Sequence, residues 1–339
     1  MNGRPDTAMP VVPGDEFRDD LRQAERALPA DVLGRLTVLD DRQSWKAMLG
    51  TVAAALGAVG VAAWAWTPWV VVPAIVIIAT RQHAMFVLAH EAAHYRLLSA
   101  RRRNDVVGRW LGRVNGISMC SYRVVHRLHH NHLYGPQDPD LALHGGYPRG
   151  RVYLLRKLAA DVCGLTAWKT FRYFFGDPAA NAATGEKPRP LDDTSPALRT
   201  AALKDRWGVV VWHLAVPVGM ALAAGPPGLL RYVVLWLVPL ATVLQALLRL
   251  RAIAEHGAPL GTGSCLVAAR THRTGRLARF FLFPHHVNFH VEHHLYPAVP
   301  QYRLPALHEE LARRGVLRHA DVRSLAQTWR RVYAPRATR

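Results

Sequence analysis

Eight of the 18 histidines in this chain fall into three short patterns. Residues His90 to His94 follow the pattern HxxxH, and both His126 to His130 and His290 to His294 follow HxxHH. Spacings of three and four residues place side chains on one face of a helix, so each pattern can present two or three imidazoles to a common point. The patterns therefore predict a metal site.

The number of imidazoles bears on how many ions the site holds. Eight ligands exceed the needs of one ion, whereas two ions with four or five ligands each account for them. Imidazole suits Zn, Cu, Fe and Ni, and no Cys-x-x-Cys pair supplies thiolates, since Cys120, Cys163 and Cys265 lie far apart in sequence. Among redox metals, iron also offers the chemistry that a buried apolar substrate would require.

Two other metal proteins share parts of this pattern. His90 and His94 alone match HExxH, in which Glu91 would be the general base of a membrane zinc metalloprotease. That interpretation leaves six clustered histidines unused. A receptor-like membrane protein with one structural zinc needs about four ligands, so the surplus argues against it as well.

The composition indicates where the metal site lies. Half of the residues are hydrophobic, yet the net charge is +19, with 43 Lys and Arg against 24 Asp and Glu. The runs 47–80 and 207–230 contain no charged residue, and a membrane span needs about 20 apolar residues. Basic residues lie between these runs, and no zinc-finger or basic-zipper pattern is present, so we expect a membrane protein that binds no nucleic acid.

Two apolar hairpins carry the four expected spans. The first pair of spans is about 47–66 and 69–90, and the second is about 207–224 and 229–250. Thr67-Pro68 separates the first pair, and Gly225 to Gly228 separates the second, because Pro and Gly mark the points where a helix stops. The sequence therefore predicts an all-α integral membrane protein of four transmembrane helices with a cytosolic helical cap.

Charge orients these spans. The N-terminal tail, the segment 81–206 and the residues from Arg249 onward carry nearly all the basic residues, whereas the two turns carry none. The positive-inside rule then places both termini and the metal site in the cytosol, and the Arg- and Ala-rich composition suits a bacterial inner membrane. The polar first 45 residues are not a cleavable signal peptide.

The return helix of each hairpin is expected to reach beyond the bilayer. As one helix, Trp69 to Leu98 is about 45 Å long against about 30 Å of hydrocarbon, so His90 and His94 would protrude into the cytosol. The second return helix would run on to His256. Pro73 and Pro239 are expected to kink these helices.

The remaining segments are expected to surround the metal site. Residues 151–175 mix aromatic and basic residues and suit a helix on the membrane surface, and 176–196 is a polar loop. Two short charged helices, about 305–314 and 320–332, would complete the cytosolic cap.

The order of the three histidine patterns among four spans resembles the membrane fatty acid desaturase and hydroxylase superfamily. Asn288 to Pro297 (NFHVEHHLYP) resembles the third histidine box of that family with its trailing aromatic-Pro pair, and Asp138-Pro139-Asp140 resembles its acidic turn. The resemblance divides the chain into an N-terminal tail (1–45), a desaturase-like domain (46–315) and a basic C-terminal tail (316–339).

The resemblance implies a non-haem di-iron centre with O2 as co-substrate. Such enzymes reduce O2 with two external electrons and take hydrogen from an unactivated C–H bond, giving an alkene or an alcohol. The ligands carried over by position are His90, His94, His126, His129, His130, His290, His293 and His294.

The boxes also bear on the substrate. The third box begins with His290 instead of the Gln of front-end desaturases, and the first box is shorter than in stearoyl-coenzyme-A desaturases. Both points favour desaturation of an acyl lipid or a carrier-bound fatty acid. The alternative is hydroxylation or desaturation of a non-lipid compound, either amino-acid-derived or isoprenoid.

Electrons are expected to come from a separate protein. No His-Pro-Gly-Gly haem signature, Cys-rich cluster motif or Gly-rich dinucleotide fingerprint is visible. A ferredoxin, rubredoxin or b-type cytochrome would then be the donor, and the basic cytosolic face suits an acidic one.

Further residues are candidates around the boxes. His256 is predicted as a ninth iron ligand because Glu255-His256 follows the fourth span and resembles an additional Glu-His element of the family, although a histidine before Gly257 can also simply end a helix. Four carboxylates could orient the imidazoles or be ordinary polar surface: Glu91, Asp138, Asp140 and Glu292. Four histidines outside the patterns are expected not to be ligands: His83, His132, His285 and His286.

Overall fold

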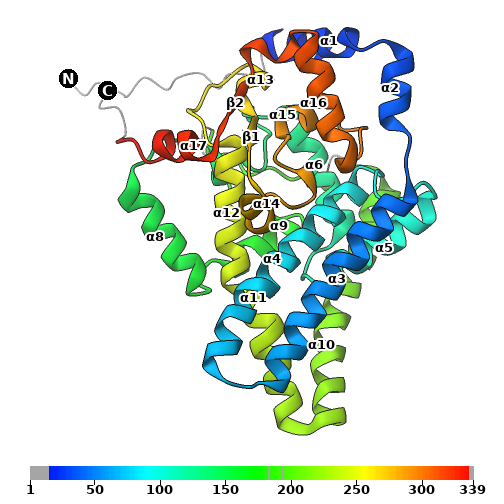
Figure 1. The fold of residues 1–339 in the computed structure, drawn as a ribbon, viewed down its shortest axis with the longest axis vertical. Coiled ribbons are helices and arrows are strands. Elements are labelled where there is room, and N and C mark those ends of the chain that lie inside the picture. Colours follow the sequence, from blue (N-terminus) through cyan, green and yellow to red (C-terminus); the bar gives the residue numbers. More distant parts are fainter. Residues whose placement is uncertain (1–14, 182–183, 193, 336–339) are drawn as a thin grey trace.

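A computed structural model of the chain describes residues 15–181, 184–192 and 194–335, so residues 1–14 and 336–339 of the two predicted tails lie outside the described part. The chain is mostly helical, as predicted (Figure 1). The α-helices are α1 (Asp15–Ala27), α2 (Ala30–Thr37), α3 (Asp41–Trp64), α4 (Pro68–Ala93), α5 (Arg101–Arg113), α6 (Met119–His132), α7 (Leu141–His144), α8 (Arg151–Val162), α9 (Ala167–Phe174), α10 (Pro196–Tyr232), α11 (Val238–Ala241), α12 (Val243–His256), α13 (Cys265–Ala268), α14 (Arg276–Phe281), α15 (His290–Leu295), α16 (Leu304–Arg313) and α17 (Leu325–Val332).

Helices α3 and α4 form the first predicted hairpin: α4 contains the expected span 69–90, and α3 contains all but the last two residues of the expected span 47–66. The Asp40 side chain caps α3 by accepting a hydrogen bond from the Arg42 amide, and α4 begins at Pro68, whose fixed φ suits a first helical turn. The prediction that the second helix runs to Leu98 is wrong. It ends at Ala93, because Tyr95 adopts a left-handed conformation (φ 59°) and the Arg96 amide bonds back to the Glu91 carbonyl.

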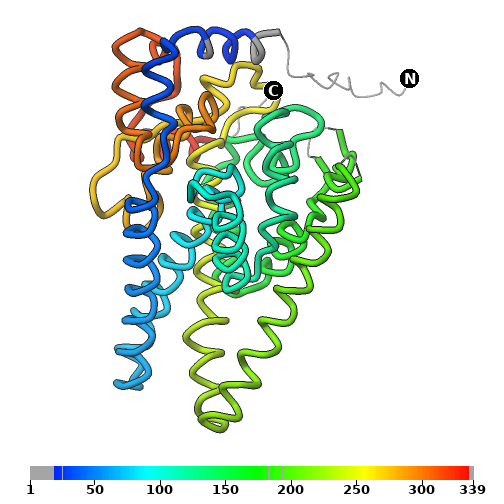
Figure 2. Tube along the Cα trace, turned by 90° about the vertical axis from the view of Figure 1, so that its right-hand side faces the viewer, coloured from blue at the N-terminus to red at the C-terminus, as the bar shows by residue number. Residues whose placement is uncertain are grey.

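Helices α10 to α12 form a helical segment of 61 residues that reverses direction. Gly225 has φ 64° and ψ −164°, which is not helical, and the chain returns from the lower end of the molecule toward α12 (Figures 1 and 2). The return is irregular near Pro239, as expected. It passes through a π-helical turn, η1 (Val233–Leu237), and a break at Thr242 before α12 begins.

Three helical segments in the described residues are long and apolar enough to cross a membrane: 30–64, 68–93 and 196–256. Their outer faces carry exposed apolar side chains, among them Leu56 on α3 and Leu222 on α10. Trp64 and Trp69 lie exposed on either side of the first turn, a position typical of the aromatic residues at a membrane interface. These surfaces fit an integral membrane protein, because water would solvate them poorly.

The cap lies at the end of the molecule opposite the hairpin turns (Figures 1 and 2). It contains a parallel pair of strands, β1 (Arg270–Arg273) and β2 (Asp321–Ser324), which the sequence had not indicated. The helix predicted over about 320–332 is therefore wrong at its start, because β2 pairs with β1 there and α17 begins only at Leu325. Short 3-10 turns join the other pieces: η2 (Pro284–His286), η3 (Gln301–Arg303) and η4 (Val316–His319).

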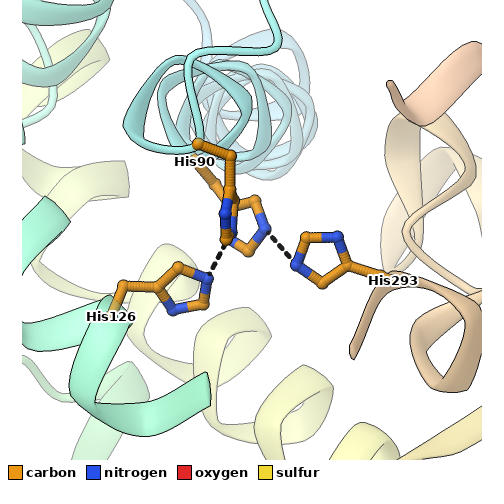
Figure 3. Close-up of side chains that lie close together, drawn as sticks. His90, His126 and His293 are labelled. Atoms are coloured by element: carbon orange, nitrogen blue, oxygen red, sulfur yellow. Dashed lines mark hydrogen bonds between the residues drawn. The ribbon is translucent and has the colours of Figure 1, made fainter. Parts of the chain in front are cut away.

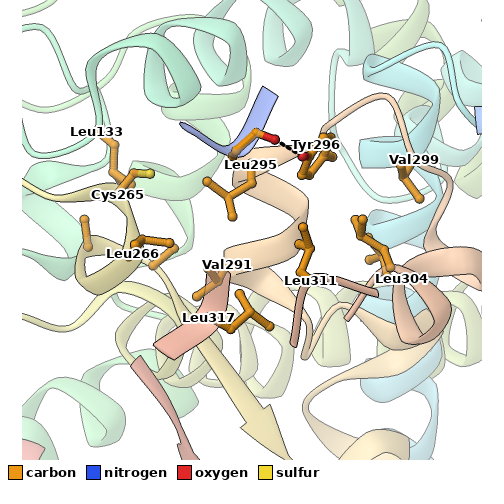
Figure 4. Close-up of a cluster of buried hydrophobic side chains, with 14 of the residues drawn as sticks. Leu133, Cys265, Leu266, Val291, Leu295, Tyr296, Val299, Leu304, Leu311 and Leu317 are labelled. Atoms are coloured by element: carbon orange, nitrogen blue, oxygen red, sulfur yellow. Dashed lines mark hydrogen bonds between the residues drawn. The ribbon is translucent and has the colours of Figure 1, made fainter. Parts of the chain in front are cut away.

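A buried apolar cluster holds α15 in the cap, and thereby positions the third histidine box. Val291 and Leu295 of α15 pack with Leu304 and Leu311 of α16, as Figure 4 shows. Helix α1 also packs against α15, and the Tyr296 hydroxyl donates a hydrogen bond to the Ala24 carbonyl. Helix α1 therefore helps to hold α15, which carries the third histidine box, in place.

The predicted surface helix 151–175 is two helices, α8 and α9. They are separated at Gly164, which has φ 76°. Helix α8 packs against α12, and α9 packs against α6, so both pieces line the side of the metal site.

Candidate metal centre

Four helices carry the predicted ligands to one place. Helix α4 packs against α6 and α12, and histidines of α15 in the cap meet histidines of all three helices. The α6 helix begins where the Ser118 side chain accepts a hydrogen bond from the Ser121 amide. The structure brings all nine predicted histidines together: His90 and His94 at the end of α4, His126, His129 and His130 on α6, His256 at the end of α12, and His290, His293 and His294 on α15.

Five imidazoles form a first cluster. Nε2 of His90 lies 2.9 Å from Nε2 of His293, and Nε2 of His126 lies 2.9 Å from that of His94. The ring of His130 joins them, with its Nε2 3.0 Å from His126 and 3.2 Å from His293. Figure 3 shows His90, His126 and His293 pointing toward one another from three separate helices.

Four imidazoles form a second cluster. Nε2 of His256 lies 2.7 Å from Nε2 of His290 and 3.3 Å from Nε2 of His129. The ring of His294 completes the group, with its centroid 4.9 Å from that of His256. The two clusters adjoin, because the rings of His130 and His294 stack with centroids 4.2 Å apart.

The donor set fits a cation in the second cluster. Nδ1 of His256 lies 3.0 Å from the Ala268 carbonyl oxygen, which can only accept, so the Nδ1 carries the proton and Nε2 presents a lone pair. That lone pair faces two other ring nitrogens at the same time. Nε2 of His294 is buried without a hydrogen-bond partner among the described residues. A metal ion would satisfy these nitrogens, since nitrogens bound at about 2.1 Å to one ion lie about 3 Å apart.

The absence of protonation also favours metal binding in the first cluster. Burial, with the neighbouring imidazoles, holds the pKa of His126, His130 and His293 well below its usual value. For His94, burial and nearby arginines lower the pKa to about 3. These rings are therefore neutral at pH 7, which is the state in which imidazole binds a metal.

The acidic turn supports the second cluster directly. Nδ1 of His129 donates to Oδ1 of Asp138 at 3.0 Å, which leaves Nε2 of the same ring facing His256. Burial alone would lower the pKa of His129, but Asp138 and Asp140 outweigh it and raise the pKa to about 9. Two carboxylates thus make this place favourable for positive charge, whether it is a proton or a metal.

A further carboxylate lies at the edge of the second cluster. Oε2 of Glu255 is 3.7 Å from Nε2 of His290, and both carboxylate oxygens accept from Nε of Arg251, at 2.8 and 2.9 Å. Glu255, His256 and His290 could together hold an ion. From its sequence position, Glu255 was only part of the motif that located His256.

The other two candidate carboxylates lie elsewhere. Glu91 accepts a hydrogen bond from the Gln301 amide at 2.9 Å, and Glu292 accepts from the Thr271 hydroxyl and lies against His308. They join α4 and α15 to other parts of the cap, whereas the sequence left open whether they orient imidazoles or are ordinary polar surface. Glu91 is therefore held by the backbone of the cap, whereas the general base of a zinc protease must face a water bound to the metal.

Two residues near the clusters escaped the sequence analysis. Nε2 of His144 lies 3.4 Å from Oδ2 of Asp138, and its ring is 5.0 Å from that of His256. The Tyr122 hydroxyl lies 3.0 Å from Nδ1 of His90. Tyr122 precedes His126 by one helical turn, so its spacing could have drawn attention to it, whereas His144 has no such signal.

The four histidines expected to be non-ligands lie outside both clusters. His83 is buried 3.5 Å from Arg251, and Nε2 of His285 lies 3.1 Å from the Thr51 hydroxyl. His286 stands beside Phe289, and His132 is partly exposed at the end of α6.

A cavity of about 320 Å³ adjoins both clusters. Its wall includes His126 of the first cluster and His129, His256 and His290 of the second. A compound in this cavity would therefore lie directly beside any metals that the histidines hold.

Comparison with known proteins agrees with this site. The family model described as fatty acid desaturase matches residues 66–323, which is most of the chain, so the chain belongs to the fatty acid desaturase family. It is an oxidoreductase, as predicted. A curated relative is the dihydrorhizobitoxine desaturase of Bradyrhizobium elkanii, which is 26% identical over 294 residues, covering 84% of this chain and 76% of the relative.

Proposed function

We propose that the chain is an O2-dependent di-iron desaturase. The observation that carries this proposal is the convergence of nine buried imidazoles into two adjoining clusters beside a cavity. Two clusters account for more ligands than one structural or catalytic zinc uses. The family and the desaturase relative support the same class of reaction.

The two clusters would hold one iron each. His90, His94, His126, His130 and His293 would hold the first, and His129, His256, His290 and His294 the second. When bound, such a metal pair supplies the redox chemistry that removes hydrogen from an unactivated C–H bond. In the overall reaction, two substrate hydrogens, O2, two electrons and two protons yield an alkene and two waters.

The protein's own groups orient the rings and exclude water. Asp138 and the Ala268 carbonyl fix the tautomers of His129 and His256, and Tyr122 contacts the outer nitrogen of His90. Apolar side chains of the cap pack around Val291 and Leu295 of α15 and keep water away from this helix. Substrate in the cavity would be held against His126 and His290.

We further propose four membrane crossings with both termini and the metal site in the cytosol. The reversal at Gly225 supports two crossings within residues 196–256, and the basic segments lie on the cap side of both hairpins. A separate ferredoxin, rubredoxin or b-type cytochrome would then reach the site from the cytosol. The domain limits 46–315 remain part of this proposal.

The substrate has two candidates. An acyl chain of a lipid or a carrier-bound fatty acid suits a site at the membrane, and it is the kind of substrate that the description of the family names. A small non-lipid metabolite is favoured by a specific observation, the charged residues in the cavity wall, which include Arg249, Arg251 and Lys157. The name of the relative from Bradyrhizobium elkanii points in the same direction.

The test begins with purified chain in lipid nanodiscs. Elemental analysis should find about two irons per chain, and a single zinc without iron would overturn the proposal in favour of a zinc enzyme. Reduced ferredoxin and O2 should support turnover, whereas turnover with a nicotinamide cofactor and O2 alone would contradict a separate donor. Mass spectrometry of lipids and polar metabolites, after expression in a host lacking unsaturated acyl chains, distinguishes the two substrate candidates.

A further inference from the structure

The cavity beside the clusters has an apolar part and a charged part. Phe86, Tyr122 and Phe174 pack edge to face, with ring centroids 5.1 to 5.5 Å apart, and form an aromatic wall next to His126. Elsewhere the wall holds seven charged side chains, of which four are cationic and three are anionic: Lys157, Lys169, Arg249, Arg251, Asp140, Asp161 and Glu255.

Each of the three carboxylates already has partners in the wall. Asp161 pairs with Arg249, at 2.5 and 2.9 Å, and also accepts from the Thr166 hydroxyl. Glu255 pairs with Arg251, and Asp140 lies 3.5 Å from Nδ1 of His129. The negative charge of the wall is therefore neutralised within the protein.

The two lysines differ from the arginines in this respect. Lys157 lies over the Tyr153 ring at 5.5 Å and Lys169 over the Trp168 ring at 5.3 Å, and neither forms an ion pair with a carboxylate in the described residues. Lys157 is partly buried and Lys169 is exposed, which places them on the outer side of the cavity. The cavity wall thus carries positive charge at two lysines that no described carboxylate neutralises.

We infer that the substrate is a small aliphatic carboxylate, which rests on the proposed desaturase function. Its carboxylate lies at Lys157 and Lys169, and its carbon chain lies against the aromatic wall beside the histidines. A charged wall is a poor place for a long hydrocarbon, since apolar contact leaves polar groups unsolvated. The volume is also at the low end of the roughly 300–1,000 Å³ of small-molecule pockets.

Binding of labelled hexanoate to the full chain, loaded with iron in phosphatidylcholine nanodiscs, tests this inference without turnover. We expect saturable binding of hexanoate and of 2-aminohexanoate, and much weaker binding of the neutral isostere hexanamide and of hexylamine. The double variant Lys157→Gln/Lys169→Gln should weaken hexanoate binding about tenfold or more, because two charge-assisted contacts are lost.

Control variants show whether the effect is local. Lys204→Gln removes an exposed lysine outside this cavity and should leave hexanoate binding unchanged. The double variant Lys157→Arg/Lys169→Arg keeps both charges and should retain most of the binding. Both cavity variants should keep the iron content of the parent chain, which shows that the site is still folded.

Three results would overturn the inference: hexanamide binding as tightly as hexanoate, oleate competing better than hexanoate, or no saturable hexanoate binding. Iron content, measured on the same preparation, separates this failure from failure of the proposed function. Two irons without hexanoate binding would reject the carboxylate substrate alone, whereas absence of iron would reject the di-iron site itself.

Discussion

The two histidine clusters differ in the charge that surrounds them. The first is a group of histidines alone, and its outer contact at His90 is the neutral Tyr122 hydroxyl. The second combines histidines with carboxylates: Asp138 bonds to His129, Asp140 lies nearby, and Glu255 approaches His290. A dication in the first cluster would keep its full charge, whereas one in the second would be partly neutralised.

The clusters also differ in their position relative to the cavity. The second cluster contributes three of its four rings to the cavity wall, and the first contributes only His126. Substrate would therefore meet mainly the metal whose surroundings are acidic. This difference suggests unequal roles for the two metals.

The largest effect is expected from His256→Ala. His256 presents the lone pair around which the second cluster gathers, so its loss should empty the second site and abolish turnover while the first site keeps its metal. Iron analysis should fall from about two to about one per chain. His319→Ala, in the η4 turn, is the matched control and should change neither quantity. Two retained irons with near-normal activity would show that His256 is not a ligand.

Asp138→Asn should have the next largest effect. The variant removes the charge that holds His129 in its tautomer, and loss of such a partner typically costs about 10- to 100-fold in metal affinity. Competition with a chelator should show the loss in the second site and leave the first unchanged. Asp177→Asn, which alters a partly exposed ion pair with Arg172 and Lys187, serves as the control. An equal loss from both sites would mean that Asp138 acts only through the fold.

Glu255→Gln should change the second site more gently. The amide keeps the shape of the side chain but removes a negative charge 3.7 Å from His290, so metal affinity should fall by about tenfold or less. Mössbauer spectroscopy should show one of the two iron signals altered. Glu91→Gln, on the helix that supplies the first cluster, should alter neither signal, because Glu91 contacts the Gln301 amide instead. Equal changes in both variants would remove the distinction between the clusters.

The smallest effect is expected from Tyr122→Phe. The phenylalanine keeps the aromatic wall but loses the hydroxyl 3.0 Å from Nδ1 of His90, which should weaken the first site about threefold. The chelator competition used for Asp138→Asn measures this directly. A loss as large as that from the aspartate would show that a neutral partner orients an imidazole as strongly as a charged one.

The sequence alone was enough to find the histidines and the first hairpin. Helical spacing within each box fixes which side chains share a face, and this property is local. Uncharged runs of about 20 residues similarly identify membrane helices without knowledge of their neighbours. The family expected from the boxes is confirmed by the match over residues 66–323, and the mostly helical fold is confirmed as well. His256 could be proposed because it follows a span directly.

Only the tertiary structure decided how these residues are shared between two clusters. His130 stands beside His129 in sequence, yet their nitrogens face different clusters, because adjacent residues point about 100° apart on a helix. The pairing of the four-residue strands β1 and β2 and the approach of His144 to His256 likewise depend on neighbours distant in the chain. The charged cavity arises where α6, α8, α9 and α12 meet, and no segment by itself contains that arrangement.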